Sequence, residues 1–352
     1  MARRTVVGLD IGTSGVRAAE LRSGRGGATL ERFAQVALPA GAVRDGEVVD
    51  VETVGAAIRE LWAIGKFRSR RVVVGVANQK VVVRQVDLPW LPGRQLKESL
   101  AFQVPDYIPM SVENALLDYH PLEEFTDEQG NRMLRVLLVA AARDMVSSVL
   151  DAVHVAKLQP AMVDLTSFAV LRSQLPAAGH LSVDAEVLVD VGHSVTNIVI
   201  HQAGVPRFVR ILLLGGGDVT SAVAERLSVS DEQAEDLKYA TGLPTGLDVS
   251  EDVVARVIES TGGAFVEEVR GTLNYYASQP EAPRIGRVVL SGGGSMLGGL
   301  VERLSTATRL PVELARPTST LRIGDTGLSG DQLAVLEPRI TVPVGLALGL
   351  AS

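Results

Sequence analysis

Apolar and polar positions alternate along the first part of the chain in three short segments, residues 5–11, 16–22 and 29–38, with Gly and Ser in the turns between them. Such alternation predicts three β-strands joined by tight turns. Beyond Asp50, which can cap the free amides of a first turn, apolar residues recur at helical spacing, and a further apolar strand is expected at residues 71–77. The first part of the chain is therefore predicted to form three strands, a helix and a strand.

The same order of elements returns in the second half of the chain. Strands are predicted at residues 186–191, 195–201 and 207–214, a helix at residues 219–227 and, after a further helical region, a strand at residues 287–291. A duplicated unit of this kind predicts two related lobes that face each other across a cleft. Ligands of such folds bind where loops from both halves converge.

Two insertions interrupt the repeated units. The first contains apolar patterns typical of a helix at about residues 94–107, strands at residues 116–123 and 133–142, and a helix at residues 144–158, and predicts a small α+β domain. The second insertion is expected to be helical, and it begins with Ser230 and Gln233 at the spacing of a capping box.

Composition narrows the class of protein. At 352 residues the chain is too long for one ordinary compact domain, which agrees with two lobes. Its formal net charge of −7 argues against a general surface for nucleic acid or anionic membranes, and we interpret the basic run from Arg68 to Arg71 as a solvated loop. Cysteine is absent and the five histidines show no ligand spacing, so the sequence excludes disulfides and metal sites held by Cys and His.

Hydrophobic stretches of the chain are short. The N-terminal residues lead straight into the first apolar strand, without the hydrophobic region of a signal peptide. The longest unbroken apolar stretch, residues 342–351, is about half of the roughly 20 residues that a membrane-spanning helix needs. We therefore expect a cytoplasmic protein that associates with a membrane only through a partner.

An Asp at the end of the first strand begins a turn suited to binding phosphate. Asp10 is followed by Gly12, Thr13 and Ser14. Glycine lets backbone amides converge on an anion, and the two hydroxyls add hydrogen-bond donors. A carboxylate beside phosphates would repel them unless a cation lay between, so we interpret Asp10 as holding Mg²⁺ through water.

The second half of the chain repeats this turn. Asp190 ends a predicted strand and is followed by Gly192, His193, Ser194 and Thr196. Either turn alone is typical of an ordinary hairpin. Because the two occur at matching points of a duplicated unit, we predict that they hold phosphates from both sides, with Asp190 again holding Mg²⁺ through water.

A third segment rich in glycine follows the strand expected at residues 287–291. It contains Gly292, Gly293, Gly294 and Ser295 and precedes a predicted helix. Three glycines give a flat backbone surface for a purine or ribose, near a helix N-terminus that favours phosphates. A single Gly-rich turn is weak evidence, but this one is third in an ordered series.

The order of these three segments resembles the superfamily of actin, Hsp70 and the sugar kinases. The resemblance implies that the ligands are ATP and Mg²⁺, with a phosphate-1 loop at residues 10–14, a phosphate-2 loop at residues 190–196 and an adenosine motif at residues 290–295. It also implies a helix of small residues near residues 340–350 that packs the two lobes together.

The same resemblance assigns three further site residues. Arg17 occupies the position of the Lys that usually follows the phosphate-1 loop, which keeps the positive charge and changes its geometry. Glu235 and Lys238 match a Glu and a Lys that contact ribose and adenine in bacterial actins. The alternative for Glu235 and Lys238 is a solvent-facing ion pair on one helical face.

The first insertion resembles that of the PilM family of type IV pilus assembly proteins. The resemblance is carried by residues 102–109 (FQVPDYIP), 117–119 (LDY) and 135–146 (RVLLVAAARDMV), and it extends over essentially the whole chain. The Glu usual before the Tyr-Ile-Pro motif is absent here, where Val104 and Pro105 stand.

The fold class implied is α/β: an actin-like two-lobe fold (ASKHA) with duplicated ribonuclease-H-like domains and an FtsA-like inserted α+β subdomain. We expect lobe 1A at residues 1–80 and 159–185, the inserted subdomain 1C at residues 81–158, lobe 2A at residues 186–227 and 284–339, the helical subdomain 2B at residues 228–283, and a C-terminal helix packing on lobe 1A at residues 340–352.

The function implied is an ATP-binding scaffold of the pilus assembly machine at the inner face of the cytoplasmic membrane. By resemblance, a PilN-like bitopic membrane protein places its cytoplasmic N-terminal tail in a groove between the inserted subdomain and the first lobe. We expect the groove to be lined near Leu96, Leu100 and Ile108, the alternative being that these residues form the core face of their own helix. Contacts with other pilus assembly components and self-association are left open.

Two other functions compete with this prediction. A small-molecule kinase of the same superfamily needs a catalytic carboxylate, for which Asp164 is the best candidate, and by resemblance Asp164 could position an attacking water for slow ATP hydrolysis. The alternative for Asp164 is a cap of the helix that begins near Thr166. A filament-forming or division protein like FtsA ordinarily uses a C-terminal amphipathic helix, and the sequence ends directly after the expected packing helix.

Overall fold

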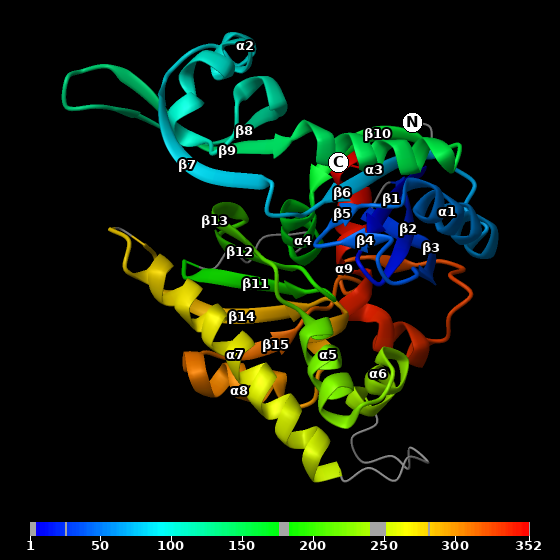
Figure 1. Ribbon diagram of the computed structural model, residues 1–352. Coiled ribbons are helices and arrows are strands. Elements are labelled where there is room, and N and C mark those ends of the chain that lie inside the picture. Colours follow the sequence, from blue (N-terminus) through cyan, green and yellow to red (C-terminus); the bar gives the residue numbers. More distant parts are fainter. Residues whose placement is uncertain (1–4, 25–26, 176–182, 240–250, 281, 352) are drawn as a thin grey trace.

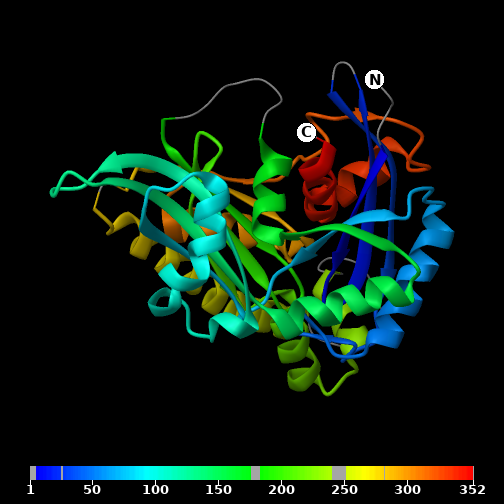
Figure 2. The ribbon, with the colours of Figure 1, turned by 90° about the horizontal axis from the view of Figure 1, so that it is seen from above.

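Two lobes, each built on a β-sheet, and a projecting subdomain make up the protein (Figure 1). The computed structural model describes residues 5–24, 27–175, 183–239, 251–280 and 282–351. Seen from above, the inserted subdomain extends to one side of the first lobe (Figure 2).

The sheet of the first lobe has six strands in the order β10-β6-β1-β2-β3-β16. These are β1 (Thr5–Ile11), β2 (Gly15–Gly24), β3 (Gly27–Ala37), β6 (Arg71–Val76), β10 (Gln159–Leu165) and β16 (Arg322–Ile323). β1 pairs antiparallel with β2 and parallel with β6. The strands predicted for the first unit are confirmed, with small differences at their ends.

The sheet of the second lobe has five strands in the order β13-β12-β11-β14-β15. These are β11 (Ala185–Val191), β12 (Thr196–Gln202), β13 (Val205–Leu212), β14 (Ile285–Ser291) and β15 (Val312–Leu314). β11 pairs antiparallel with β12 and parallel with β14, as β1 pairs with β2 and β6. The predicted duplication is therefore confirmed by strand connectivity as well as by strand order.

Helices cover the outer face of each sheet. On the first lobe these are α1 (Val51–Gly65) and α3 (Arg143–Val155), which pack on Val7 and Leu9 of β1. Asp50 caps α1 as predicted, since its side chain accepts a hydrogen bond from the Thr53 amide at 3.0 Å. The outer face of the second lobe is covered by α5 (Gly216–Leu227), α6 (Asp231–Tyr239), α7 (Glu251–Ala277) and α8 (Leu300–Thr308).

Two of these helices begin with features that the sequence predicted only in part. The capping box at the start of α6 is confirmed: Gln233 N donates to Ser230 Oγ at 3.2 Å, and Ser230 N donates to Gln233 Oε1 at 3.1 Å. α5 begins at Gly216, which is earlier than the residue 219 that was predicted. Glycine disfavours helix interiors, but here Gly216 and Gly217 belong to the first turn of the helix and Gly215 precedes it as the N-cap.

Two helices lie between the sheets and form the core that the lobes share. These are α4 (Thr166–Gln174) and α9 (Gly330–Ala351), packed between Val6 and Val73 of the first sheet and Leu188 of the second. A Cβ added at Gly345 would lie only 1.8 Å from the backbone oxygen of Ala169, so α9 and α4 touch backbone to backbone there. A helix near residues 340–350 that packs the lobes together is confirmed, although it begins well before residue 340.

By length and hydropathy alone, α9 could cross a membrane. Gly330–Leu350 contains an 18-residue window with a mean hydropathy of 1.5, of which 56% is buried within the fold. The sequence prediction counted only unbroken apolar residues and so missed the length of this helix. Its apolar surface is used in the contact between the lobes, as in other buried core helices.

The inserted subdomain has a three-stranded antiparallel sheet in the order β7-β9-β8, covered by α2. Its elements are β7 (Val81–Pro89), α2 (Gly93–Gln103), the short 3₁₀ helices η1 (Pro105–Tyr107) and η2 (Val112–Asn114), β8 (Ala115–Thr126) and β9 (Arg132–Ala142). The single helix predicted at residues 94–107 is wrong in its last turn. α2 stops before Pro105, which disfavours helical backbone in the residue before it. The α+β character of the insertion is as predicted, and the exact subdomain boundaries remain a proposal.

Candidate functional site

A cavity of about 300 Å³ lies between the two lobes and receives residues from both repeated units. Its wall is made by Ser14, Gly15, Val16, Arg17, Gln35, Val36 and Ala37 of the first lobe, by Gly192, His193, Gly216, Glu235, Lys238, Tyr239, Gly293 and Gly294 of the second, and by Arg339 of α9. Eight of the residues proposed from the sequence for nucleotide binding meet here. The volume is that of a small-molecule site.

The turn after β1 is closed by its own backbone. Gly12 N donates to Gly15 O at 3.0 Å, and Ser14 lies at the cavity wall. Arg17 stands opposite Asp10 in the β1–β2 pair and donates from Nη1 to Asp10 Oδ2 at 2.9 Å. The positive charge expected after the phosphate-1 loop is therefore present, and it is held at the cavity by the carboxylate predicted to bind Mg²⁺.

The turn after β11 has the same form and is tied to the start of α5. Gly192 N donates to Val195 O at 2.9 Å, while Gly216 N and Gly217 N donate to the carbonyls of Gly192 and His193 at 2.9 and 2.7 Å. These bonds join the phosphate-2 turn to a helix N-terminus, where the helix dipole favours anions. Burial lowers the pKa of His193 below its ordinary value, so this side chain is neutral at pH 7.

The three glycines at the start of α5, residues 215–217, were not predicted to belong to the site. A Cβ added at Gly215 would lie 2.5 Å from the backbone oxygen of His193, so only glycine allows the helix to approach the phosphate-2 turn this closely. The Gly-Gly-Gly-Asp run was the sequence signal for this helix start. Asp218, at the third helical position, caps the helix by accepting a hydrogen bond from Gly215 N at 2.7 Å.

The two aspartates of the repeated turns influence each other across the cleft. Asp190 is buried and accepts a hydrogen bond from Ser291 Oγ at 2.8 Å. Burial, with a smaller contribution from the charge of Asp10, raises the pKa of Asp190 to about 6. Two carboxylates in this arrangement fit a hard cation, which would relieve their repulsion.

The number of carboxylates also suits Mg²⁺. Within the described residues no group of three or more His, Cys, Asp or Glu is placed to hold a metal ion. A cation at Asp10 and Asp190 would therefore complete its coordination with water and phosphate oxygens, which is the usual environment of Mg²⁺ in nucleotide sites. That Asp10 and Asp190 hold Mg²⁺ through water remains a prediction.

Glu235 and Lys238 form an ion pair at the cavity wall, in which the lysine is buried and the glutamate is partly exposed. Lys238 is 2% exposed, and its Nζ donates to Glu235 Oε2 at 2.6 Å, to Thr220 Oγ1 at 2.8 Å and to Gly216 O at 3.1 Å. The alternative of a solvent-facing ion pair is therefore wrong. Burial lowers the pKa of Lys238, and the Glu235 carboxylate opposes that shift. All three ammonium protons have protein partners, so Lys238 fixes α6 against α5, while Glu235 lines the cavity.

Two cavity residues were missed from the sequence. Tyr239 follows Lys238 and donates from its hydroxyl to Gly293 O at 3.4 Å. Arg339 comes from α9, and its Nε lies 3.6 Å from the position of a Cβ at Gly293. An aromatic residue beside Lys238 was a usable signal for a purine site. No signal in the sequence marked Arg339, because the C-terminal helix was predicted to begin at residue 340.

Three predicted residues of the phosphate-2 loop and the adenosine motif support the cavity from behind it. Thr196 is buried and donates to Leu214 O at 2.7 Å, and Ser295 is buried and donates to Gly292 O at 2.7 Å. The Gly292 amide donates to Pro338 O of α9 at 2.9 Å. The structure does not bring these three to the cavity wall, nor Gly12, Thr13 and Ser194 of the turns. The helix expected directly after the glycines is a 3₁₀ turn, η3 (Gly293–Met296), and α8 begins later.

Asp164 does not line the cavity between the lobes, and its catalytic role stays a prediction. Its carboxylate forms an ion pair with Arg172, which also donates to Gly345 O of α9. It lines a different cavity. The alternative that Asp164 caps α4 is wrong, because the cap residue is Leu165 and no side chain makes a capping bond.

The cavity that Asp164 lines is a groove of about 370 Å³ between the inserted subdomain and the first lobe. Its lining is Val76, Leu116, Leu117, Asp118, Tyr119, His120, Val139, Ala141, Val146, Val163, Asp164, Leu165 and Phe168. β8 and β10, which contribute to it, are each at one edge of their sheet in the described part of the chain.

The predicted lining of this groove was misplaced. Leu96, Leu100 and Ile108 are buried in the core of the inserted subdomain, so the alternative interpretation, a core face, is correct for them. The sequence could not distinguish the two, because apolar side chains at helical spacing look the same in either place.

Two lobes of duplicated topology, closed over a cavity by a pair of Asp-bearing turns, define an actin-like protein. MreB 5 of Spiroplasma citri bound to AMPPNP has the same fold, with a TM-score of 0.56 and 11% identity over 99% of this chain and 96% of that one. The sequence model for the type IV pilus assembly protein PilM matches residues 8–350, and the chain belongs to this family. The fold class and the family inferred from the sequence are confirmed.

Two further comparisons agree with this assignment. The solved PilM-PilN type IV pilus biogenesis complex matches with a TM-score of 0.88 and 26% identity, over 100% of both chains. The cell division protein FtsA of Rhizobium meliloti (strain 1021) is 28% identical over 182 residues, which is 46% of this chain. The chain spans 39% of the length of that curated relative.

Proposed function

We propose that this protein is a nucleotide-dependent scaffold of the type IV pilus assembly machine. It binds ATP with Mg²⁺ between its lobes and recruits a PilN-like inner-membrane protein through that protein's cytoplasmic N-terminal tail. Family membership and the similarity to a PilM-PilN complex support this function over a small-molecule kinase or a division protein. The observation that carries the proposal is that two separate cavities border the first lobe, one suited to a nucleotide and one to a peptide.

ATP is the ligand that the cleft between the lobes fits. Ser14 and Gly192 lie at the two turns that would hold the phosphates, and Arg17 supplies positive charge between them. Glu235 and Tyr239 line the wall beside Gly293, where the ribose and purine would lie. A bound Mg²⁺ would neutralise phosphate charge beside Asp10 and Asp190. Scaffolding requires binding and closure of the lobes, and it makes no demand on the rate of hydrolysis.

An extended peptide is the partner that the second groove fits. Unpaired backbone groups on an edge strand, such as β8 or β10, can accept a further strand, and alternate side chains of that strand would reach the apolar groove floor. A tail of this kind would hold the protein at the cytoplasmic face of the inner membrane. Contacts with other pilus assembly proteins would then be made on the remaining surface.

Calorimetry tests both halves of the proposal. Wild-type protein should bind ATP in the presence of Mg²⁺, and Asp10→Ala and Asp190→Ala should each weaken this binding, whereas Asp151→Ala on the exposed face of α3 should not. A synthetic peptide with the sequence of the tail of the PilN-like protein from the same genome should bind separately. Equal ATP affinity in all four proteins would show that the nucleotide binds elsewhere, and absence of peptide binding would refute the assignment of the partner.

A further inference from the structure

The inserted subdomain joins the first lobe through a narrow neck of two chain segments. The chain enters at residues 77–80, between β6 and β7, and leaves at Ala142, the last residue of β9, directly before α3. Ala142 N donates to Lys80 O at 3.0 Å, and Val81 is paired with Ala141 in the sheet. The two segments therefore move as one unit, and the orientation of the subdomain is set at the neck.

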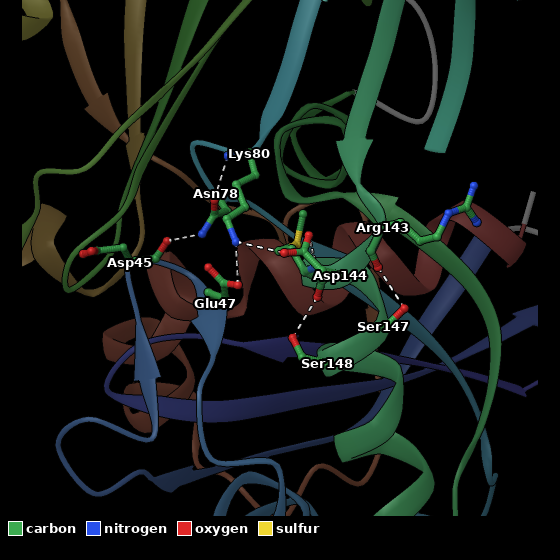
Figure 3. Close-up of polar contacts among 9 residues, drawn as sticks. Asp45, Glu47, Asn78, Lys80, Arg143, Asp144, Ser147 and Ser148 are labelled. Atoms are coloured by element: carbon green, nitrogen blue, oxygen red, sulfur yellow. Dashed lines mark hydrogen bonds and ion pairs between the residues drawn. The ribbon is translucent and has the colours of Figure 1, made fainter. Parts of the chain in front are cut away.

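Lys80 fastens this neck to a hairpin of the first lobe. The hairpin is formed by β4 (Val43–Arg44) and β5 (Glu47–Val48) and was not predicted from the sequence. Lys80 Nζ donates to Glu47 Oε1 at 2.8 Å and to Asp144 Oδ2 at 3.2 Å, at the first turn of α3 (Figure 3). The Lys80 side chain is 42% exposed, and ion pairs of this exposure add little to stability, so its geometric effect is its main contribution.

The tip of the hairpin touches both the neck and the second lobe. Gly46 has φ +79°, and a Cβ there would lie 2.0 Å from Ala77 O and 3.4 Å from Cγ2 of Val195. Asn78 is buried and donates from Nδ2 to Asp45 O at 2.8 Å (Figure 3). Val195 belongs to the phosphate-2 turn, where its carbonyl accepts the bond from Gly192 N. The tip of the hairpin therefore lies beside the phosphate-2 turn, within reach of a displacement of that turn.

The groove for the peptide begins where the neck ends. Val76 precedes the entering segment, Ala141 precedes the leaving segment, and Val146 lies in the first turn of α3 beyond Asp144. All three line the groove. A small rotation of the inserted subdomain about the neck would change the separation of β8 from β10, which form the two sides of the groove.

We propose that Lys80 is a positioning residue that makes the affinity of the groove depend on the nucleotide. Closure of the lobes on the nucleotide moves the phosphate-2 turn against Gly46, the hairpin passes the movement through Asn78 and Lys80 to the neck, and the subdomain settles in one orientation. The inference rests on the proposed function, since it concerns regulation between its two sites. Coupling of this kind is reciprocal, so the peptide must change the affinity for nucleotide by the same factor.

The test is a calorimetric cycle with the peptide of the PilN-like tail and the ATP analogue AMPPNP with Mg²⁺. In wild-type protein the peptide Kd should differ by at least about fivefold between the two nucleotide conditions. Lys80→Met and Glu47→Gln should bring this ratio close to one while the nucleotide still binds in the absence of peptide. Lys66→Met, at an exposed lysine of the same lobe, should leave the ratio at the wild-type value.

The possible outcomes separate the inference from the proposed function. If wild-type protein fails to bind one of the two ligands, the proposed function fails and the inference fails with it. If both bind but the ratio in the wild type is one, only the inference fails. If the ratio is large and unchanged in both variants, coupling passes through the contact of β7 with β13 instead, and the role of Lys80 is refuted. Glu47→Gln decides the matter if Lys80→Met does not fold.

Discussion

Replacing Asp190 with Asn should stabilise the nucleotide-free protein while weakening its binding of ATP and Mg²⁺. Asp190 is buried at the cleft, and the Asp10 carboxylate acts on it from the opposite turn. An ionised carboxylate in this position is unfavourable without a cation. Asn removes the charge and keeps an oxygen that can accept the hydrogen bond from Ser291 Oγ, which lies 2.8 Å from Oδ1 of Asp190.

The magnitude follows from the pKa of Asp190, which rises from 3.8 to about 6 in the folded protein. This difference corresponds to about 3 kcal/mol of free energy of unfolding, lost when Asp190 ionises in the fold. Because the folded state holds its proton to a higher pH than the unfolded chain, stability falls as the pH rises from about 4 to about 6. The new amide needs hydrogen-bond partners of its own, so we expect a net gain of about 1–2 kcal/mol at pH 7.5.

Denaturant unfolding in the presence of EDTA measures this effect. Asp190→Asn should raise the free energy of unfolding at pH 7.5, and the gain should disappear near pH 4, where the wild-type side chain is protonated. Asp151→Asn, on the exposed face of α3, should change stability little at either pH. A loss of stability at pH 7.5, or a gain of equal size at both pH values, would refute the reasoning.

Three further predictions concern packing and the peptide groove. Glu235→Ala leaves the buried charge of Lys238 without its carboxylate and should lower the free energy of unfolding by about 3 kcal/mol, measured with denaturant; a change below about 0.5 kcal/mol would contradict the pairing. Gly345→Ala must displace the backbone of α4 and should lower the free energy of unfolding by at least about 2 kcal/mol. The control Gly263→Ala, in open space on α7, should raise the free energy of unfolding by up to about 1 kcal/mol. Equal effects of the two substitutions would disprove the close helix contact. Leu117→Asp should abolish binding of the PilN-like peptide by calorimetry and leave ATP binding intact; retained peptide binding would exclude this groove.

Local signals in the sequence gave the two sheets and the turns of the cleft. Asp10 and Asp190 each lie near the end of an apolar strand, and the glycine two residues later permits the tight turn that follows. The order of strands in each lobe followed from the repeat, because consecutive strands with short turns pair with each other. These are features that neighbouring residues determine among themselves.

Contacts between side chains of different elements could not be predicted from these local signals. The carboxylate of Asp164 is taken by Arg172 and that of Glu235 by Lys238, and spacing alone does not say whether a pair faces water, a ligand or the core. The hairpin carrying Glu47 has strands of only two residues, and it is held by Lys80 across the fold. Short elements of this kind have little propensity of their own and depend on tertiary contacts.

The position of α9 between the sheets has a consequence for biosynthesis. α9 follows both lobes in the chain, so the strands of the first lobe leave the ribosome with the inner face of their sheet, including Val6 and Val73, still uncovered. Contacts that span most of the sequence form slowly, and uncovered apolar sheet faces promote aggregation during that delay. Nascent chains stalled before residue 330 should therefore stay bound to chaperones. Emergence of α9 from the ribosome should be the step at which the chaperones dissociate.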